Sequence, residues 1–155
     1  MSNDCIFCQI VAGKIPSYQV WEDEKHLAFL TIFPNTDGVT VVIPKEHKNS
    51  YLFANEDVVI QDLLKAAKVV AQKIDTAFDD VGRTGLIFEG FGVDHLHAKL
   101  YPMHGTKHTI DHWENIANSK PTEFFDRYPG YLSSHDCDKE DDAKLKQIAE
   151  RIKKA

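Results

Sequence analysis

The stretch Gly92-Val93-Asp94-His95-Leu96-His97-Ala98-Lys99-Leu100 decides how the rest of the chain is interpreted. In an extended strand, side chains alternate between two faces, so both histidines and the lysine share one face and the apolar residues between them share the other. We expect the apolar face to point into the core. Two imidazoles and an ammonium in a row suit chemistry on an anion, because imidazole acts as a nucleophile or proton carrier and lysine holds a phosphate as a point charge. A polar row on a solvated sheet face is the alternative that the stretch leaves open.

Length and composition are those of an ordinary globular domain. The 155 residues are 43% hydrophobic and 27% charged, and a domain of this size buries about 70% of its extended-chain surface. No apolar run approaches the roughly 18 residues that a membrane span needs, and the first residues lack the basic and apolar regions of a signal peptide. We therefore expect one domain, a cytoplasmic location and no membrane partner.

The formal net charge is −6. Nucleic-acid binding is dominated by Lys and Arg that neutralise phosphates, so this charge argues against a nucleic-acid partner. A small phosphorylated ligand can still be held locally, and such a ligand is the partner that we expect.

Three cysteines make a disulfide framework unexpected, since the number is odd and two of them are three residues apart. Cys5 and Cys8 form a Cys-x-x-Cys half-site, which can hold one side of a tetrahedral zinc if two more ligands come from elsewhere. A metal site and free thiols are both open on this motif alone. Cys137, in a polar segment, is interpreted as a surface or tail thiol.

The remaining pattern alternates short strands with two helices. A long apolar stripe at helical spacing predicts a core-facing helix over 56–78, with Asn55 as its cap. Asp and Glu near the start and Lys and Arg near the end predict a final helix over 141–154. The other expected elements are a short helix over 5–12 and strands over 19–22, 26–32, 39–44 and 85–89.

In order and spacing, these segments resemble the histidine-triad (HIT) superfamily of nucleotide hydrolases and transferases. The resemblance extends from residue 5 to about residue 103, and its motifs are CIFCQI at 5–10, IP at 15–16, AFL at 28–30, VIPKEH at 42–47 and VDHLH at 93–97. It implies an α+β fold in which an antiparallel sheet packs with one long helix, in a homodimer. Residues 1–105 would form the HIT domain, and 106–155 a C-terminal extension packed on the same domain.

The resemblance also implies an activity: the bond at the α-phosphate of a nucleotide or nucleotide conjugate is broken. By position, His97 is the nucleophile that forms a covalent phospho-histidine, which water then resolves. Lys99 stands where the family usually has the third histidine, and it would stabilise charge on the phosphate. Residues expected to bind the phosphate or nucleotide are Thr31, Ile32, Gly90, Phe91, Gly92 and Lys99.

Two departures from the family pattern concern substrate binding. Thr31 replaces the aspartate that binds ribose hydroxyls in many members, and this change predicts weaker or altered nucleoside recognition. The segment 89–93 is shortened and lacks the usual Gln and Ser, so phosphate contacts would rest on backbone groups and Lys99. The leaving group and base preference stay open.

Members with an N-terminal Cys-x-x-Cys hold a structural zinc. The matching ligands here are Cys5, Cys8, His47 and His95, a closed Cys₂His₂ set. The alternative is two buried thiols and two unrelated histidines.

The sequence leaves two other function classes open. One is a catalytically weak nucleotide- or phosphate-binding regulatory protein on the same zinc-stabilised fold. The other is a zinc-stabilised interaction module, for which the acidic charge is unfavourable if the partner is nucleic acid. In the extension, Trp113, Tyr128 and Tyr131 are expected either to cover the pocket or dimer surface or to pack as a tail.

Overall fold

A computed structural model describes residues 5–115, 126–127 and 143. Contacts divide the chain into one compact unit over residues 1–113 and another over residues 114–155. The helices and strands given below all belong to the first unit.

Several predictions concern residues outside the described ranges. These are the thiol of Cys137, the roles of Tyr128 and Tyr131 and, except for residue 143, the helix over 141–154. The boundary at residue 105 and the packing of the extension stay predictions. Trp113 is described, and its side chain is exposed.

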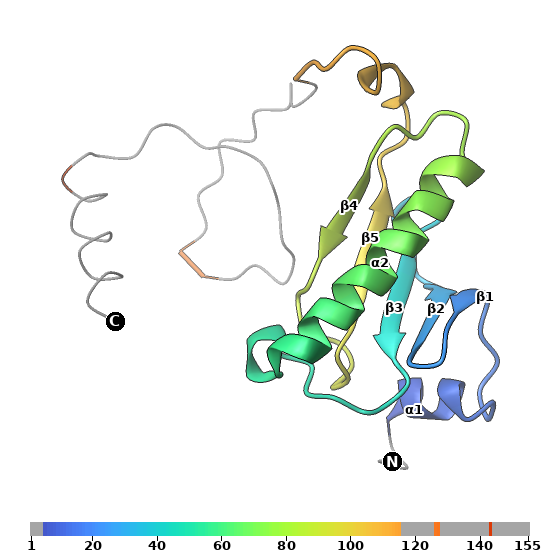
Figure 1. The fold of residues 1–155 in the computed structure, drawn as a ribbon, viewed down its shortest axis with the longest axis vertical. Coiled ribbons are helices and arrows are strands. Elements are labelled where there is room, and N and C mark those ends of the chain that lie inside the picture. The colour runs from blue at the N-terminus through green and yellow to red at the C-terminus, as the bar shows by residue number, and fades with distance from the viewer. Residues whose placement is uncertain (1–4, 116–125, 128–142, 144–155) are drawn as a thin grey trace. The chain divides into compact units, whose positions relative to one another are not determined.

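The described residues contain one antiparallel sheet of five strands in the order β1-β2-β3-β5-β4. A long helix, α2, lies across one face of this sheet (Figure 1). The predicted α+β class is confirmed. The element bounds are α1 Ile6–Val11, β1 Gln19–Glu22, β2 His26–Leu30, β3 Thr40–Pro44, α2 Asp57–Ala77, β4 Thr84–Ile87 and β5 Ala98–Pro102, with 3₁₀ turns at Leu52–Ala54 and Lys107–Thr109.

Strand register sorts the side chains of the sheet onto two covered faces. On one face, Val42 lies between Ala28 of β2 and Ala98 of β5 and packs against α2. The other face carries apolar side chains of β2 and β3 that pack against the short helix α1. Lys99 lies opposite Val41 and therefore belongs to this second face. The α1 residues that cover it are Phe7, Ile10 and Val11.

The predicted strand around the two histidines begins later than expected. β5 starts at Ala98, because the Leu96 N–H donates to the Lys48 carbonyl and the His95 N–H to the Val93 carbonyl instead of entering the sheet ladder. The expected alternation still holds, since Leu96 lies in the α2-facing core. His95 is 0% exposed, so the alternative of a polar row on a solvated face is wrong.

The long helix confirms most of the predicted stripe. Leu63, Ala66, Ala67, Val70 and Ile74 are buried on α2. Two details were wrong: Val58 is exposed, and Asn55 does not cap the helix. The residue at the N-cap position is Glu56, without a side-chain cap bond. The Asn55 side-chain amide donates instead to carbonyls of the preceding segment. The side chain that was predicted to cap α2 therefore stabilises the short turn before the helix.

His104, in the loop after β5, hydrogen-bonds to the loop after α2 and to the loop between β2 and β3. His104 Nδ1 lies 3.0 Å from the Asp80 carboxylate, and its Nε2 lies 3.0 Å from the Asp37 carbonyl. The Asp37 carbonyl and then Asp80 raise the pKa of His104 above its ordinary value. Hydrogen bonding from His104 in turn holds the pKa of Asp80 below its ordinary value.

These opposite shifts predict a window of pH in which the pair stabilises the fold. The His104 contribution is complete below its ordinary pKa of 6.5 and is lost as pH rises through the raised value. The Asp80 contribution is complete above its ordinary pKa of 3.8 and is lost as pH falls through the lowered value. The Tm difference between wild type and His104→Asn should therefore be largest between those two ordinary values and shrink at alkaline pH. A difference that is constant from pH 5 to pH 9 would contradict this assignment.

Candidate functional site

His97 lies at the end of the chain segment that enters β5, and only 2% of its surface is exposed. One ring nitrogen, Nδ1, lies 2.6 Å from the carbonyl oxygen of His95. A carbonyl only accepts, so Nδ1 carries the proton and Nε2 carries the lone pair. The backbone therefore fixes the tautomer that a nucleophilic imidazole needs.

The surroundings of His97 favour its uncharged form. Burial is the main cause that lowers the pKa of His97, and the charge of Lys99 lowers it further. The hydrogen bond to the His95 carbonyl and the charge of Glu89 act in the opposite direction but do not outweigh burial. An uncharged imidazole has a lone pair to offer to an electrophile, whereas an imidazolium has none.

Phe7 of α1 forms part of the wall around both histidines. Its ring centroid lies 5.6 Å from that of His97 and 5.8 Å from that of His95, edge to face in each case. It also packs against Phe29 of β2 at 5.4 Å. The short N-terminal helix thus contributes directly to the position of the imidazoles.

Lys99 is paired with a carboxylate. Its Nζ lies 3.6 Å from Oε2 of Glu89, and the two side chains are 31% and 16% exposed. The β4–β5 register places Ile87 opposite Lys99, so Glu89 lies two residues further along, on the same side. A negative charge therefore stands beside the predicted phosphate-binding lysine.

The loop between β4 and the histidines has a conformation that requires glycine. Gly90 and Gly92 have φ angles of +78° and +87°, in the left-handed region that other residues rarely adopt. A Cβ on Gly90 would also lie 3.0 Å from the carbonyl oxygen of Ser50. Phe91, between them, is exposed. The predicted phosphate-binding loop is thus a tight, backbone-lined turn.

Cys5 and Cys8 of the N-terminal motif come together with His47 and His95, from three separate parts of the sequence. Their ligand atoms all lie within 4.8 Å of one another. The Nδ1 atom of His95 is 3.4 Å from Sγ of Cys5 and 3.6 Å from Sγ of Cys8, and Nδ1 of His47 is 3.5 Å from Sγ of Cys8. Both cysteines are free thiols, not a disulfide.

The arrangement fits a tetrahedral zinc ion. Zn–S and Zn–N bonds of about 2.3 and 2.0–2.1 Å at tetrahedral angles separate sulfur from nitrogen by about 3.6 Å, close to the separations found. His95 Nε2 donates to the Pro44 carbonyl at 2.8 Å, which leaves Nδ1 as the lone pair facing the sulfurs. Burial raises the pKa of the Cys8 thiol, and Cys5 beside it adds to the effect. A cation would offset this by stabilising the thiolates.

The two residues predicted to bind the nucleoside lie just after β2. The Thr31 N–H donates to the Val39 carbonyl at 3.1 Å, and its hydroxyl accepts the Phe33 N–H at 3.2 Å. Ile32 is exposed. Within the described ranges, no hydrogen bond, ion pair or ring contact joins Thr31 or Ile32 to His97, so their binding role stays a prediction.

A family model described as HIT domain matches residues 12–105 of this chain. The chain belongs to the HIT family. Protein hit of Bacillus subtilis is 39% identical over 109 residues, which are 67% of this chain and 74% of that protein. An adenosine 5'-monophosphoramidase of Schizosaccharomyces pombe is 37% identical over 99 residues, 63% of this chain and 73% of that protein.

Solved structures of HIT-family proteins share the fold. The crystal structure of a HIT family member from Bacillus subtilis has a TM-score of 0.67 and 30% identity, and the match covers 98% of this chain and 96% of that one. In the part of this HIT-family chain that the structure describes, no helix is both long and apolar enough to cross a membrane.

Two residues that contact the predicted site residues, Phe7 beside His97 and Glu89 beside Lys99, were not predicted from the sequence. Glu89 was noted only as the start of a shortened loop, and Phe7 only as part of the CIFCQI motif. The proximity of Glu89 to Lys99 could have been inferred by pairing the strand over 85–89 with the stretch that contains the histidines. Phe7 carried no such signal, because nothing in the sequence says which sheet face the N-terminal helix covers.

Proposed function

We propose that this HIT-family chain is a hydrolase that acts at the α-phosphate of a nucleotide conjugate through a covalent phospho-histidine at His97. The observation that carries the proposal is the buried imidazole of His97, whose Nδ1 is held by the His95 carbonyl and whose pKa is lowered by burial. The yeast relative named as an adenosine 5'-monophosphoramidase supports a phosphoramidate of adenosine monophosphate as substrate.

The proposed reaction has two displacements at phosphorus. In the first, Nε2 of His97 forms a bond to the α-phosphorus while the bond from phosphorus to the amine nitrogen breaks, and the leaving nitrogen takes up a proton from solvent. In the second, water supplies oxygen to phosphorus and releases a proton to solvent, the Nε2–phosphorus bond breaks, and the nucleoside monophosphate leaves. If another acceptor replaces water, the same intermediate makes the protein a transferase. Splitting the reaction in this way lowers each barrier.

Binding of the phosphate falls to the loop and lysine beside His97. Gly90, Phe91 and Gly92 offer backbone N–H groups, and Lys99 offers a positive charge for the phosphoryl oxygens. We assign Thr31 and Ile32 to the nucleoside, where the threonine hydroxyl would take the place of the usual carboxylate.

The four-residue cluster would hold a structural zinc. Cys5, Cys8, His47 and His95 would be its ligands, and the ion would supply structural cross-linking of α1 to the segment that enters β5. A closed ligand set leaves no position for substrate, so the chemistry falls to His97 and its neighbours. We further propose, from the family resemblance, that the protein is a homodimer, and we propose a cytoplasmic location separately from that resemblance.

The Glu89–Lys99 pair gives one observation in favour of the second candidate, a catalytically weak nucleotide- or phosphate-binding regulatory protein. A carboxylate beside the phosphate site repels an anionic substrate. The turnover of adenosine and guanosine phosphoramidates and of dinucleoside polyphosphates by the purified protein separates the two candidates. Release of nucleoside monophosphate from any of these supports the hydrolase. Stabilisation by the same compounds without product identifies the binding protein.

Substitutions in the pair should have opposite effects on the reaction. Lys99→Met removes the positive charge and leaves Glu89 unpaired, and we expect kcat/KM to fall by about 10²–10³-fold, as for other losses of charge stabilisation. Glu89→Gln keeps the shape and frees Lys99 for the phosphate, so the KM for an anionic substrate should fall. Steady-state kinetics of both variants with one substrate are the measurement. A fall in kcat/KM of equal size in both variants would contradict the assigned roles.

A further inference from the structure

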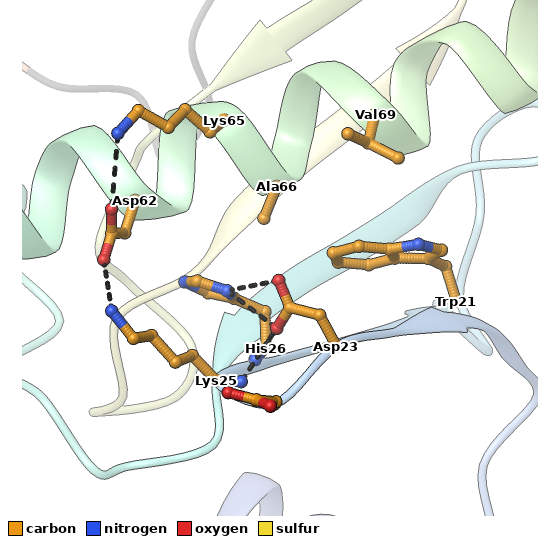
Figure 2. Close-up of a pocket in the computed structure, with 9 residues that line it drawn as sticks. Trp21, Asp23, Lys25, His26, Asp62, Lys65, Ala66 and Val69 are labelled. Atoms are coloured by element: carbon orange, nitrogen blue, oxygen red, sulfur yellow. Dashed lines mark hydrogen bonds and ion pairs between the residues drawn. The ribbon is translucent and has the colours of Figure 1, made fainter.

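A hollow distinct from the His97 site opens between the β1–β2 hairpin and α2 (Figure 2). Its volume is about 410 Å³, within the range of small-molecule sites. Neither His97, Lys99 nor any residue of the cysteine–histidine cluster lines it. Its polar groups come from the hairpin and from one face of α2.

At its base is His26, a residue that is 5% exposed. The Asp23 carboxylate lies 3.1 and 3.2 Å from His26 Nδ1, and it also accepts the backbone N–H groups of Lys25 and His26. Burial acts to raise the pKa of Asp23, but these hydrogen bonds outweigh it and hold that pKa below the ordinary value. The charged carboxylate therefore keeps a proton on Nδ1.

The second ring nitrogen of His26 is directed toward two other residues of the lining, Asp62 and Lys25 (Figure 2). No described residue hydrogen-bonds to Nε2, and in the described ranges no fully buried side-chain nitrogen or oxygen lacks a partner. Nε2 therefore keeps contact with solvent, and Figure 2 shows that edge of the ring directed toward Asp62 and Lys25. With its proton held on Nδ1, the ring presents an acceptor to an N–H donor.

Asp62 of α2 supplies a second acceptor. Lys25 Nζ lies 2.8 Å from one of its oxygens, and Lys65 Nζ lies 3.5 Å from the other. Hydrogen bonding from Lys25 is the main cause that holds the pKa of Asp62 below its ordinary value. The two lysine side chains are 70% and 75% exposed, and pairs of this kind add little to stability. A ligand with N–H donors can take their place.

We propose that this hollow binds a small planar guanidinium or amidinium cation. Two acceptors, His26 Nε2 and Asp62, lie on its lining, and the Trp21 indole supplies an aromatic wall of the kind that attracts cations. The lining carries three carboxylates (Asp23, Glu24 and Asp62) and two ammonium groups (Lys25 and Lys65), a formal excess of one negative charge with His26 neutral. This balance disfavours phosphates and carboxylates as ligands.

Other ligand classes fit less well. A metal ion needs several converging donors, and among the described residues the cluster of Cys5, Cys8, His47 and His95 is the only group of three or more that could hold one. A guanidinium or amidinium has N–H donors and no acceptor, which matches a pair of fixed acceptors. The proposal does not depend on the reaction at His97.

The test compares three ligands of the same shape and different charge. Benzamidine, benzamide and benzoate are titrated at pH 8 into the full chain carrying Trp113→Phe, so that Trp21 is its one tryptophan. Benzamidine should quench Trp21 fluorescence to saturation and shift the His26 ring signals in NMR spectra. Benzamide should bind about tenfold more weakly, and benzoate should have no effect. Equal responses to all three ligands, or benzamidine shifts at His97 without change at Trp21, would overturn the proposal.

Two substitutions on α2 form a matched pair. Asp62→Asn removes the charged acceptor and should raise the Kd for benzamidine at least about tenfold. Lys65→Gln changes the charge in the opposite sense, one helical turn away, and should lower that Kd. Neither position is among the buried residues of α2, and the Asp62 and Lys65 side chains are 25% and 75% exposed, so we expect the fold to be retained. Unchanged binding in Asp62→Asn, or weaker binding in both variants, would refute the site.

Discussion

Replacing His97 by alanine should abolish turnover of the nucleotide conjugate while the fold persists. Without the imidazole there is no group to form the covalent intermediate, and loss of a nucleophile lowers kcat by about 10⁴-fold or more in enzymes of this type. Because the side chain is 2% exposed and packs against Phe7, the substitution also leaves a small cavity. The expected cost is about 1–3 kcal/mol, which lowers the Tm without unfolding the protein at 25 °C.

Three measurements separate chemistry from folding. Circular dichroism and the Tm report whether His97→Ala is folded, and the affinity for the nucleoside monophosphate product should stay within about tenfold of wild type. The control is His104→Asn, another histidine substitution in the same unit but away from His97, which should keep wild-type turnover. A folded His97→Ala protein that retains a tenth or more of the wild-type rate would exclude His97 as the nucleophile.

Substitution of one cysteine in the cluster should cost the protein its bound metal and much of its stability. Cys8→Ser removes one of four ligands, and its sulfur lies within 3.6 Å of the ring nitrogens of both His47 and His95. Loss of a structural zinc removes several kcal/mol of folding free energy, which for a domain of this size corresponds to a fall in Tm of about 10 °C or more. Elemental analysis of the purified protein and calorimetry measure the two effects.

The chain offers a matched control for this experiment. Cys137→Ser makes the same chemical change at the remaining cysteine, and we expect it to change neither the metal content nor the Tm. Treating wild type with a strong chelator should reproduce the Tm of Cys8→Ser. If wild type, Cys8→Ser and Cys137→Ser have the same metal content and Tm, the cluster is not a structural metal site.

Local pattern was enough to predict most of the strands, the long helix and most of the residues that face the core, whereas the antiparallel sheet followed from the family resemblance. Leu96 packs on the α2 side although the chain there does not enter the ladder, because burial of apolar side chains decides the alternation. The gathering of Cys5, Cys8, His47 and His95 followed from the family resemblance and agrees with the geometry. Composition alone could not have predicted that three distant parts of the sequence meet at this cluster.

The contacts that could not be predicted from the sequence depend on the register between strands distant in sequence, or on which of several hydrogen-bond partners a side chain takes. Glu89 meets Lys99 because β4 pairs with β5 in one particular register. The Asn55 side chain hydrogen-bonds to carbonyls of the turn before α2 and not to N–H groups of the helix. Residue propensities do not say which of these two partners the side chain takes. The sequence placed Asp23 only between two predicted strands and His26 only at the start of the second, although together they line a hollow against α2.

The segment formed by α1 and the residue before it, Cys5, has a consequence for anyone who redesigns this protein. The segment Cys5–Cys8 contains two cluster cysteines, and between them Phe7 touches both His95 and His97. A library that randomises this segment to broaden substrate choice would also disturb the cysteine positions, and a graft that transfers only the cysteines would leave the imidazoles without their aromatic neighbour. In directed evolution, this helix and the histidine segment should be exchanged together as one cassette.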